Sequence, residues 1–332
     1  MNRFCGATFL TLMVCLAGCG ENNESLTSGP TNEPSGNTPS AIEQSVAAIS
    51  SDVPFSNRFD HVFITEASGL QRSKRLDGVY YTHNDSGGEA ILFATDASGH
   101  DLGTLTLTGI EPNDWEGIAG ARLNGEASLV IADIGDNGLN RGDISLLVVT
   151  EPDLNSLSFG FDVDVSSRPV SVSYADGLSY DAEAVFIDGD NDTVVVFTKN
   201  FSDTTQQAMW KGSLAAGLTA GRVVLEYRGL VFLADEQRAN AITDIDIHPN
   251  GRELAVLTYG PLATGRIHIW TAKTGEGTAD ALLRSADNVI SVPLIGTNIQ
   301  AEAISYSPGG DYLLVGAEAI SSSTLTVVQR RN

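Results

Sequence analysis

The chain has 332 residues, with 19 Lys and Arg against 42 Asp and Glu, so its formal net charge is −23. This balance argues against nucleic acid and anionic lipid as partners, because binding to either requires basic side chains that neutralise phosphate groups. An acidic surface instead suits a secreted domain or one that collects cations.

The first 18 residues have the pattern of a secretory signal. Arg3 supplies a positive charge, and the apolar run over residues 4–16 is too short to span a bilayer as a stable helix. Small residues, Ala17 and Gly18, then precede a cysteine, as they do at a cleavage site. We therefore predict that residues 1–18 are a signal peptide that is removed.

The sequence Leu16-Ala17-Gly18-Cys19 resembles the lipobox of bacterial lipoproteins. The resemblance implies a diacylglyceryl thioether on Cys19 and an acylated new amino terminus, and two or three acyl chains anchor a protein stably to a membrane. No aspartate follows Cys19, which by the sorting rule of that family favours the outer membrane, with the domain facing the periplasm or the cell surface. An ordinary signal peptide with a chance cysteine is the alternative.

The mature chain is predicted to be a tether followed by one domain. Cys5 and Cys15 leave with the signal, so cysteine catalysis and cysteine metal sites are excluded from the domain. Residues 19–57 are rich in Asn, Ser, Thr, Gly, Pro and Glu and bury too little apolar surface to fold, so we predict a disordered tether. Residues 58–332 remain for a domain of closed β architecture, expected to be monomeric.

Within this domain, short apolar runs separated by Gly, Asn, Asp and Pro repeat in a fixed order. Each repeat opens with an acidic or hydroxyl residue, then a small or acidic residue, then an aliphatic one. The five openings are Ser68-Gly69-Leu70, Glu116-Gly117-Ile118, Glu183-Ala184-Val185, Thr243-Asp244-Ile245 and Glu302-Ala303-Ile304. A second and a third strand follow in every repeat, and a fourth strand follows in all but the last.

This pattern predicts an all-β fold, a five-bladed β-propeller closed by pairing of its N- and C-terminal strands. A strand over residues 61–65 is expected to complete the last blade. Trp210 and Trp270 occupy matching third strands and are expected to pack between blades. The one helical candidate, residues 230–241, is long enough for one or two turns. A six-bladed ring is the alternative if one repeat is degenerate.

In a propeller the first strand of each blade lines the central channel, so the opening residues of the five repeats are expected to converge on its axis. They are Ser68, Glu116, Glu183, Thr243 and Glu302. Three carboxylates in a narrow channel either hold protons or bind a cation between them. A set of oxygen ligands favours a hard cation, and Ca²⁺ fits best because it accepts irregular sets of six to eight oxygens. Wet channel lining, or capping of turns between blades, is the alternative role.

The order Ser, Glu, Glu, Thr, Glu at these positions resembles that of the soluble calcium-activated nucleotidases, or apyrases. The segment Glu66-Ala67-Ser68-Gly69-Leu70 falls on a Glu-x-Ser-Glu-Leu segment of that family, and Asn84-Asp85 falls on a paired aspartate. The resemblance covers the whole domain in repeat order and implies a five-bladed propeller with Ca²⁺ on its axis. Ser68, Glu116, Glu183, Thr243 and Glu302 would then be its ligands.

The chain departs from the apyrases at the basic residues that handle phosphate. Ser86 stands where the family has an Arg, and Asp136 and the pair Thr258-Tyr259 replace basic positions of later blades. A nucleotidase needs positive charge around the transferring phosphate. The resemblance therefore supports the calcium-binding scaffold of the apyrases more strongly than their reaction. The segments 114–119 and 133–137 also resemble uncharacterised secreted bacterial propellers.

Polar side chains concentrate in the loops that would emerge on one face of the ring, which favours a site there. We expect catalytic candidates at His83, Asn84 and Asp85, with His83 as a general base. The substrate-binding candidates are Asp114, Asp133, Asp136, Asn137, Arg141, Lys199 and Asn200. Turn formation and loop capping are the ordinary alternatives for these residues.

Two functions are compatible with this pattern. The first is a binding or scaffold module with a structural calcium ion, whose ligand is a small molecule, a glycan or an envelope protein. The second is a calcium-dependent hydrolase of a phosphate or other ester. The loss of basic residues favours the binding module, and the fold by itself is compatible with both.

Overall fold

The computed structural model describes residues 56–85, 88–189, 193–199, 206–233, 241–260, 264–292, 300–318 and 323–330. The chain divides into two compact units, residues 1–38 and 39–332, and all of the described residues belong to the second unit. The predicted signal peptide, the predicted lipid site Cys19 and the tether up to residue 55 lie outside the described residues. Among the described residues, none of the helical segments has the length and hydropathy needed to cross a bilayer.

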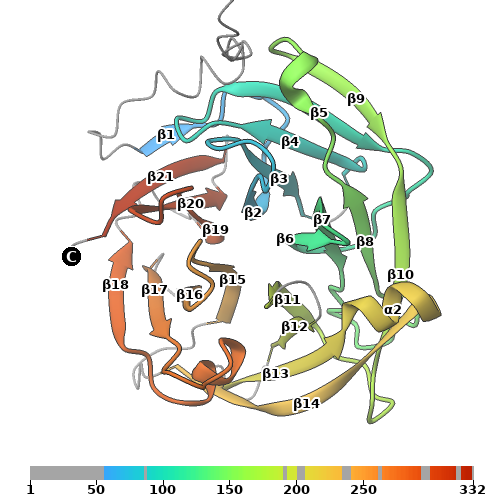
Figure 1. Cartoon of the computed structure of the whole chain (residues 1–332), viewed down its shortest axis with the longest axis vertical. Coiled ribbons are helices and arrows are strands. Elements are labelled where there is room, and N and C mark those ends of the chain that lie inside the picture. The colour runs from blue at the N-terminus through green and yellow to red at the C-terminus, as the bar shows by residue number, and fades with distance from the viewer. Residues whose placement is uncertain are drawn as a thin grey trace, which may run out of the picture. The chain divides into compact units, whose positions relative to one another are not determined.

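Most of the described elements are strands, grouped in sets of four that pair in sequence from the inside of the ring outward (Figure 1). The sets are β2 (Ala67–Arg72), β3 (Tyr80–Asn84), β4 (Ile91–Thr95) and β5 (Asp101–Leu107); β6 (Trp115–Leu123), β7 (Glu126–Asp133), β8 (Ser145–Thr150) and β10 (Ser167–Tyr174); β11 (Ala182–Asp188), β12 (Thr193–Thr198), β13 (Gln206–Ser213) and β14 (Arg222–Phe232); β15 (Ala241–Ile247), β16 (Glu253–Gly260), β17 (Thr264–Thr271) and β18 (Asn288–Val292); and β19 (Gln300–Tyr306), β20 (Tyr312–Glu318), β21 (Thr324–Gln329) and β1 (Ser56–Arg58). Pairing within each set is antiparallel.

The innermost strands close a ring. β2 contacts β6, β6 contacts β11, β11 contacts β15, β15 contacts β19, and β19 returns to contact β2. Figure 1 shows these strands around the centre, with the other strands of each set outside them. Sets of strands arranged radially around a common axis define a β-propeller, so the predicted all-β propeller architecture is confirmed.

The two ends of the domain pair with each other, as predicted, but through a different segment. β1 pairs antiparallel with β21, with Ser56 opposite Thr326. Residues 61–65 were expected to form this strand and are instead a turn in which Phe63 is exposed. The Asn84 side chain holds this turn, because its Oδ1 accepts the Thr65 N–H at 3.1 Å and its Nδ2 donates to the Phe63 carbonyl at 2.7 Å. The expectation of a strand over residues 61–65 was therefore wrong, and β1 begins inside the predicted tether.

Several elements have no counterpart among the sequence predictions. β9 (Phe161–Val165) pairs in parallel with β5, and β10 pairs in parallel with β14, which joins two sets into an eight-stranded sheet. The helix α2 (Leu214–Ala220) begins after Ser213, whose side chain caps it, and ends at Gly221 in the left-handed conformation. The predicted helical segment 230–241 begins instead inside β14, and residues 234–240 lie outside the described part of the chain. Two 3-10 turns, η1 (Leu154–Ser156) and η2 (Ala279–Leu283), complete the elements.

The core lies between neighbouring sets. Trp210 of β13 packs in one cluster with Val130 and Leu146, which belong to the preceding set. Trp270 of β17 packs with Phe186 of β11. Both tryptophans therefore join adjacent sets, as the sequence predicted.

A buried carboxylate ties three inner strands together. Asp244 of β15 accepts N–H groups from Leu70 of β2 at 3.2 Å and from Ile304 of β19 at 2.6 Å, and also from Ile245 at 2.8 Å. Asp244 is fully buried. Because these N–H groups have no water available, the carboxylate supplies the acceptors that the interior would otherwise lack.

We predict that Asp244→Ala lowers the free energy of unfolding by about 3 kcal/mol or more, since a buried N–H group left unsatisfied costs about 1–3 kcal/mol and three lose their acceptor. Chemical denaturation measures this change. Asp164→Ala is the matched control, because this substitution removes one carboxylate at an exposed position of β9. Equal stabilities for the two variants would contradict the role of Asp244.

Candidate functional site

Each innermost strand contains a β-bulge at the same place. The residue left unpaired is Glu116 in β6, Glu183 in β11, Thr243 in β15 and Glu302 in β19. In β2 the bulge falls on Gly69, whose φ of +72° suits glycine, next to Ser68. A bulge turns one side chain out of the regular alternation, so the repeated opening residues of the sequence mark these irregularities.

The structure brings five carboxylates together around Glu116. One oxygen each from Asp85, Asp114 and Glu116 lie within 4.8 Å of one another, and so do one oxygen each from Glu116, Asp181 and Glu183. We call these five residues the acidic cluster. Of the predicted metal ligands, only Glu116 and Glu183 belong to it.

Asp85 and Asp114 belong to the acidic cluster although the sequence had assigned them to catalysis and substrate binding. Asp181 is the member that sequence reasoning missed. A signal was present, because Asp114-Trp115-Glu116 and Asp181-Ala182-Glu183 repeat the same Asp-x-Glu spacing. In both strands the aspartate precedes the bulged glutamate by two residues.

The other three predicted ligands are placed differently. The Ser68 hydroxyl donates to the Glu116 carbonyl at 3.1 Å, and the Thr243 hydroxyl donates to the Ala301 carbonyl at 2.7 Å. Glu302 is not part of either group of close carboxylate oxygens. Burial, Glu318 and Asp85 raise the pKa of Glu302 to about 8. The acidic cluster therefore lies toward β6 and β11 rather than being shared evenly among the inner strands.

Negative charge in the acidic cluster is only partly compensated. Lys199 pairs with Asp181, at 3.2 Å from Nζ to Oδ2, and also with Glu183. Neither Asp114 nor Glu116 forms an ion pair with another described residue. Glu116 is only 6% exposed, and its pKa is raised well above its ordinary value by burial and by Asp85. Burial and Asp85 also raise the pKa of Asp114. This half of the cluster is the place that a cation would stabilise.

The backbone beside the acidic cluster leaves room for these carboxylates. A Cβ atom on Gly135 would lie 2.4 Å from both Asp114 Oδ2 and Glu116 Oε1. The two oxygens therefore occupy the space that any other residue at position 135 would fill. They belong to the flexible ends of side chains, so a larger residue would displace the carboxylates before it displaced the backbone.

The loop after β7 is held in place by three residues that the sequence had assigned to substrate binding. Arg141 donates to Asp133 Oδ1 at 2.7 Å and to the Gly135 carbonyl at 2.5 Å. Asp136 accepts the N–H groups of Asn140 at 2.9 Å and Arg141 at 3.0 Å. These contacts position Gly135 against the acidic cluster, so the loop-capping role holds for Asp133 and Asp136.

Of the remaining substrate-binding candidates, Asn137 is exposed, Lys199 forms the ion pairs given above, and Asn200 lies outside the described residues.

The three catalytic candidates are consecutive residues, but their side chains have different surroundings. His83 is fully buried, its ring meets Trp115 edge-on at 5.6 Å, and burial lowers its pKa to about 4. Asn84 uses its side chain to hold the turn at residues 61–65. This placement does not support His83 as a base on the loop face, because a buried neutral imidazole has no access to substrate. Asp85 alone of the three lies in the acidic cluster.

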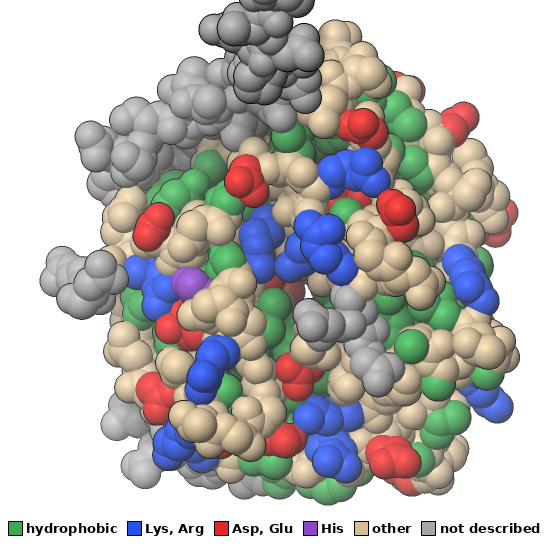
Figure 2. Space-filling model, viewed as in Figure 1, with side chains coloured by type: hydrophobic (Ala, Val, Ile, Leu, Met, Phe, Trp, Pro, Cys, Tyr) green, Lys and Arg blue, Asp and Glu red, His purple; other side chains and the backbone are tan. Residues whose placement is uncertain are grey.

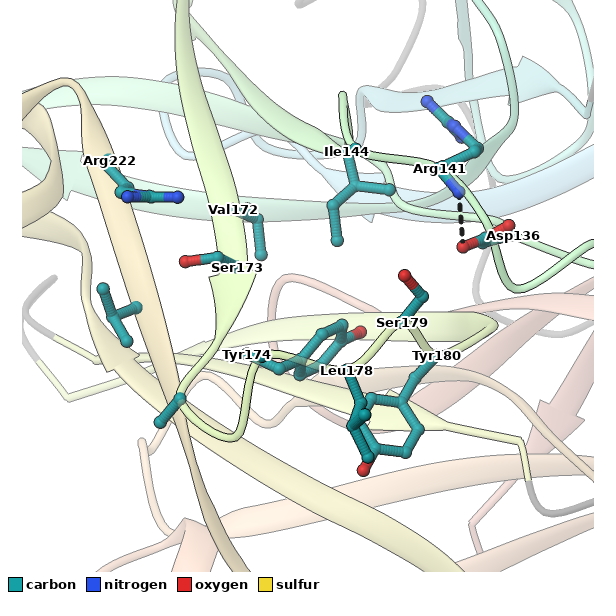
Figure 3. A pocket seen from close by; sticks show the side chains of 14 residues that line it. Asp136, Arg141, Ile144, Val172, Ser173, Tyr174, Leu178, Ser179, Tyr180 and Arg222 are labelled. Atoms are coloured by element: carbon teal, nitrogen blue, oxygen red, sulfur yellow. Dashed lines mark hydrogen bonds between the residues drawn. The ribbon is translucent and has the colours of Figure 1, made fainter.

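A pocket of about 450 Å³ lies beside the loop after β7 (Figure 3), and one of its lining residues, Tyr180, directly precedes Asp181 of the acidic cluster. Its walls include Ile144, Val172, Tyr174 and Tyr180, and Asp136 and Arg141 lie at one side. The backbone N–H of Asp136 donates to Asp181 Oδ1 at 2.8 Å, which links the pocket wall to the cluster.

The pocket has the composition of a ligand site. Tyr174 meets Tyr180 and Trp210 edge-on, at 4.8 and 4.9 Å between ring centroids. The Tyr174 hydroxyl is buried without a hydrogen-bond partner among the described residues. Leu178, at the pocket, is 63% exposed. Charged side chains, Asp136, Arg141 and Arg222, line the pocket beside the aromatic rings, and its volume lies in the range of small-ligand sites.

No protein-family model matches the chain, and no curated protein matches it. Solved structures similar to it include a Kuenenia stuttgartiensis hydrazine synthase, at 15% identity over 75% of this chain and 61% of that one, with a TM-score of 0.37. The Dos1 propeller is 14% identical over 81% and 59% of the two chains, with a TM-score of 0.35. A chain of the mitotic checkpoint complex is 15% identical over 79% and 63%, with a TM-score of 0.36. This chain thus spans about three fifths of each.

We predict that, in EDTA, the stability of the chain falls as the pH rises from 4.5 to about 8, because folded Glu302 keeps a proton that the unfolded chain releases above its ordinary pKa of 4.5. Thermal unfolding across this pH range measures the effect. Glu302→Gln removes the titration, so its melting temperature should depend less on pH than that of the wild type. Identical pH profiles for the two chains would contradict the assignment.

Proposed function

We propose that this chain is a five-bladed β-propeller lipoprotein of the bacterial envelope that binds Ca²⁺ at the acidic cluster and a ligand in the adjoining pocket. The observation that carries the proposal is the convergence of buried and half-buried carboxylates at the end of β3 and the beginnings of β6 and β11 onto Glu116. A positive partner offsets the repulsion among these carboxylates, and Lys199 forms ion pairs with Asp181 and Glu183 on one side of Glu116.

Five blades are supported by the ring of contacts among β2, β6, β11, β15 and β19. Each of these strands begins one set of four, and β1 completes the last set. The lipid anchor at Cys19 and the outer-membrane location rest on the lipobox resemblance, and Ser56 at the start of β1 leaves a tether of residues 20–55 between the lipid and the ring.

Calcium suits the donors of the acidic cluster. Asp85, Asp114 and Glu116 offer carboxylate oxygens only, and hard cations prefer oxygen. Calcium also tolerates irregular geometry and completes its shell with water or backbone carbonyls. Asp181 and Glu183 lie on the other side of Glu116 and share Lys199. A bound ion would neutralise Glu116 and fasten the end of β3 to β6.

The pocket is the proposed ligand-binding site. Asp136 connects its wall to Asp181, so occupation of the acidic cluster and the shape of the pocket are mechanically linked. The aromatic and aliphatic walls favour a ligand with an apolar face, such as a sugar ring or a peptide side chain. The ligand-binding role requires no reacting group, in agreement with the burial of His83.

A calcium-dependent hydrolase is the second candidate, and the presence of Asp85 in the acidic cluster favours it. In that role Asp85 would position a water molecule beside the ion. Release of p-nitrophenol from p-nitrophenyl phosphate or acetate by the calcium-loaded chain, lost in Asp85→Asn, would support the hydrolase. Absence of turnover leaves the binding module as the function.

We predict that calcium raises the melting temperature of the full chain relative to EDTA, because an ion that binds only the folded state stabilises it by mass action. Glu116→Gln should remove most of this shift, since Glu116 is shared by both halves of the acidic cluster. Glu226→Gln, at an exposed position on β14, is the control with the same charge change. Equal melting temperatures of the wild type in calcium and in EDTA would refute the calcium site.

A substitution that leaves every charge in place tests the geometry. Gly135→Ala places a methyl group against Asp114 and Glu116, so we expect calcium affinity to fall by about tenfold or more, a difference of about 1.4 kcal/mol. Stability in EDTA should change little, because only side-chain ends move. Gly142→Ala in the same loop is the control, since its Cβ meets nothing within 4 Å. Unchanged affinity in Gly135→Ala would place the ion elsewhere.

A further inference from the structure

The end of the ring opposite the acidic cluster carries a basic cavity. The acidic cluster lies at the beginnings of β6 and β11, whereas this cavity lies at the ends of the inner strands and in the turns that follow. In β2, Ser68 and Arg72 are four residues apart, which separates the two levels by about 13 Å. Figure 2 shows this face, with Lys and Arg side chains gathered beside the centre of the ring.

The cavity has a volume of about 500 Å³. Its basic lining residues are Arg72, Lys74 and Arg122, together with His248. Three Lys and Arg side chains around one cavity are unusual in a chain with 19 basic and 42 acidic residues. Such a concentration creates a local positive potential within a negative field.

Two of the cations are fixed by the protein itself. Arg72 donates to Asp246 Oδ2 at 2.5 Å and to the Ile247 carbonyl at 2.8 Å, so its position is set by β15. Arg122 donates through Nη2 to the Lys74 carbonyl at 2.7 Å. A guanidinium that is already oriented binds an oxyanion at a lower entropic cost than a free surface side chain.

The Lys74 ammonium has no hydrogen-bond or ion-pair partner among the described residues. Its stem lies over β6, where a Cβ on Gly120 would come within 2.5 Å of Lys74 Cε. Burial, followed by the charges of Arg72 and Arg122, lowers the pKa of Lys74 to about 8. The ammonium is therefore held beside two like charges without an acceptor, and an anion would relieve this repulsion.

Two described carboxylates near the cavity are engaged by other groups. Asp246 is engaged by Arg72, by Ser305 at 3.1 Å and by the Tyr306 N–H at 2.8 Å. Glu151 accepts from the Ser73 hydroxyl and from the Lys74 backbone N–H at 3.0 Å. Asp77 is exposed at the cavity.

We propose that Arg72, Lys74 and Arg122 form a binding site for a phosphate group at this end of the ring. Guanidinium and ammonium groups together are the donors that phosphate oxygens require, and two arginines held in place add directional hydrogen bonds. The volume admits a phosphate group with a small organic body. The site does not depend on calcium or on the pocket beside the acidic cluster.

The full chain is titrated calorimetrically with inorganic phosphate in EDTA, with chloride adjusted to keep the ionic strength constant. EDTA excludes binding through calcium. We expect saturable binding that Lys74→Met weakens at least tenfold. Lys273→Met, at an exposed turn position, is the matched control and should bind as the wild type does. Arg122→Gln is the second variant should Lys74→Met fail to fold, and it should also weaken binding.

A parallel arm uses vesicles containing phosphatidylglycerol, whose headgroup presents the same phosphate chemistry. Binding of free phosphate identifies a soluble ligand, and vesicle binding that both variants weaken identifies a lipid headgroup. Absence of binding in both arms overturns the proposal. So does binding that Lys74→Met and Arg122→Gln leave unchanged.

Discussion

The architecture depends on closing a chain of strands into a ring. β1 pairs with β21, so the last set of four is completed by residues from the other end of the domain. Inside, each innermost strand touches the next until β19 returns to β2. Asp244 reinforces that junction by accepting N–H groups from both Leu70 and Ile304. Closure makes residues separated by many positions in the sequence neighbours in space, and the acidic cluster exists because of it.

Carboxylates held close together repel one another, and the fold alone does not fully offset this repulsion. Burial raises the pKa of Glu116, and the charges of Asp85 and Asp114 add to that shift. Lys199 pairs with Asp181 and Glu183, and its positive charge also opposes the rise in the pKa of Glu116. Gly135 lies against the carboxylates of Asp114 and Glu116. A hard cation is the partner that this arrangement favours. Asp136 lines the neighbouring pocket, and its backbone N–H donates to Asp181 of the acidic cluster.

The two ends of the inner strands have opposite electrostatic character. Carboxylates gather where β6 and β11 begin, whereas Arg72, Lys74 and Arg122 gather at the other end. The proposed calcium and phosphate sites therefore lie on opposite sides of the closed ring and use separate residues. Rigid strands between them hold each set of charges at a fixed spacing.

The repeats in the sequence predicted a β-propeller, and the missing fourth strand of the last repeat predicted the pairing of the chain ends, because periodicity is a local property that the chain carries. Sequence also placed Trp210 and Trp270 between sets. It did not determine which carboxylates meet, since the bulges aim Glu116 and Glu183 toward Asp114 and Asp181 while Glu302 lies apart. Nor did the sequence show that β1, rather than residues 61–65, forms the strand that closes the ring. Asn84 holds the backbone of residues 61–65 in a turn. The basic cavity around Lys74 was likewise invisible, because its residues come together only when β2, β6 and β15 meet. Such contacts depend on distances between strands, which only the closed ring sets.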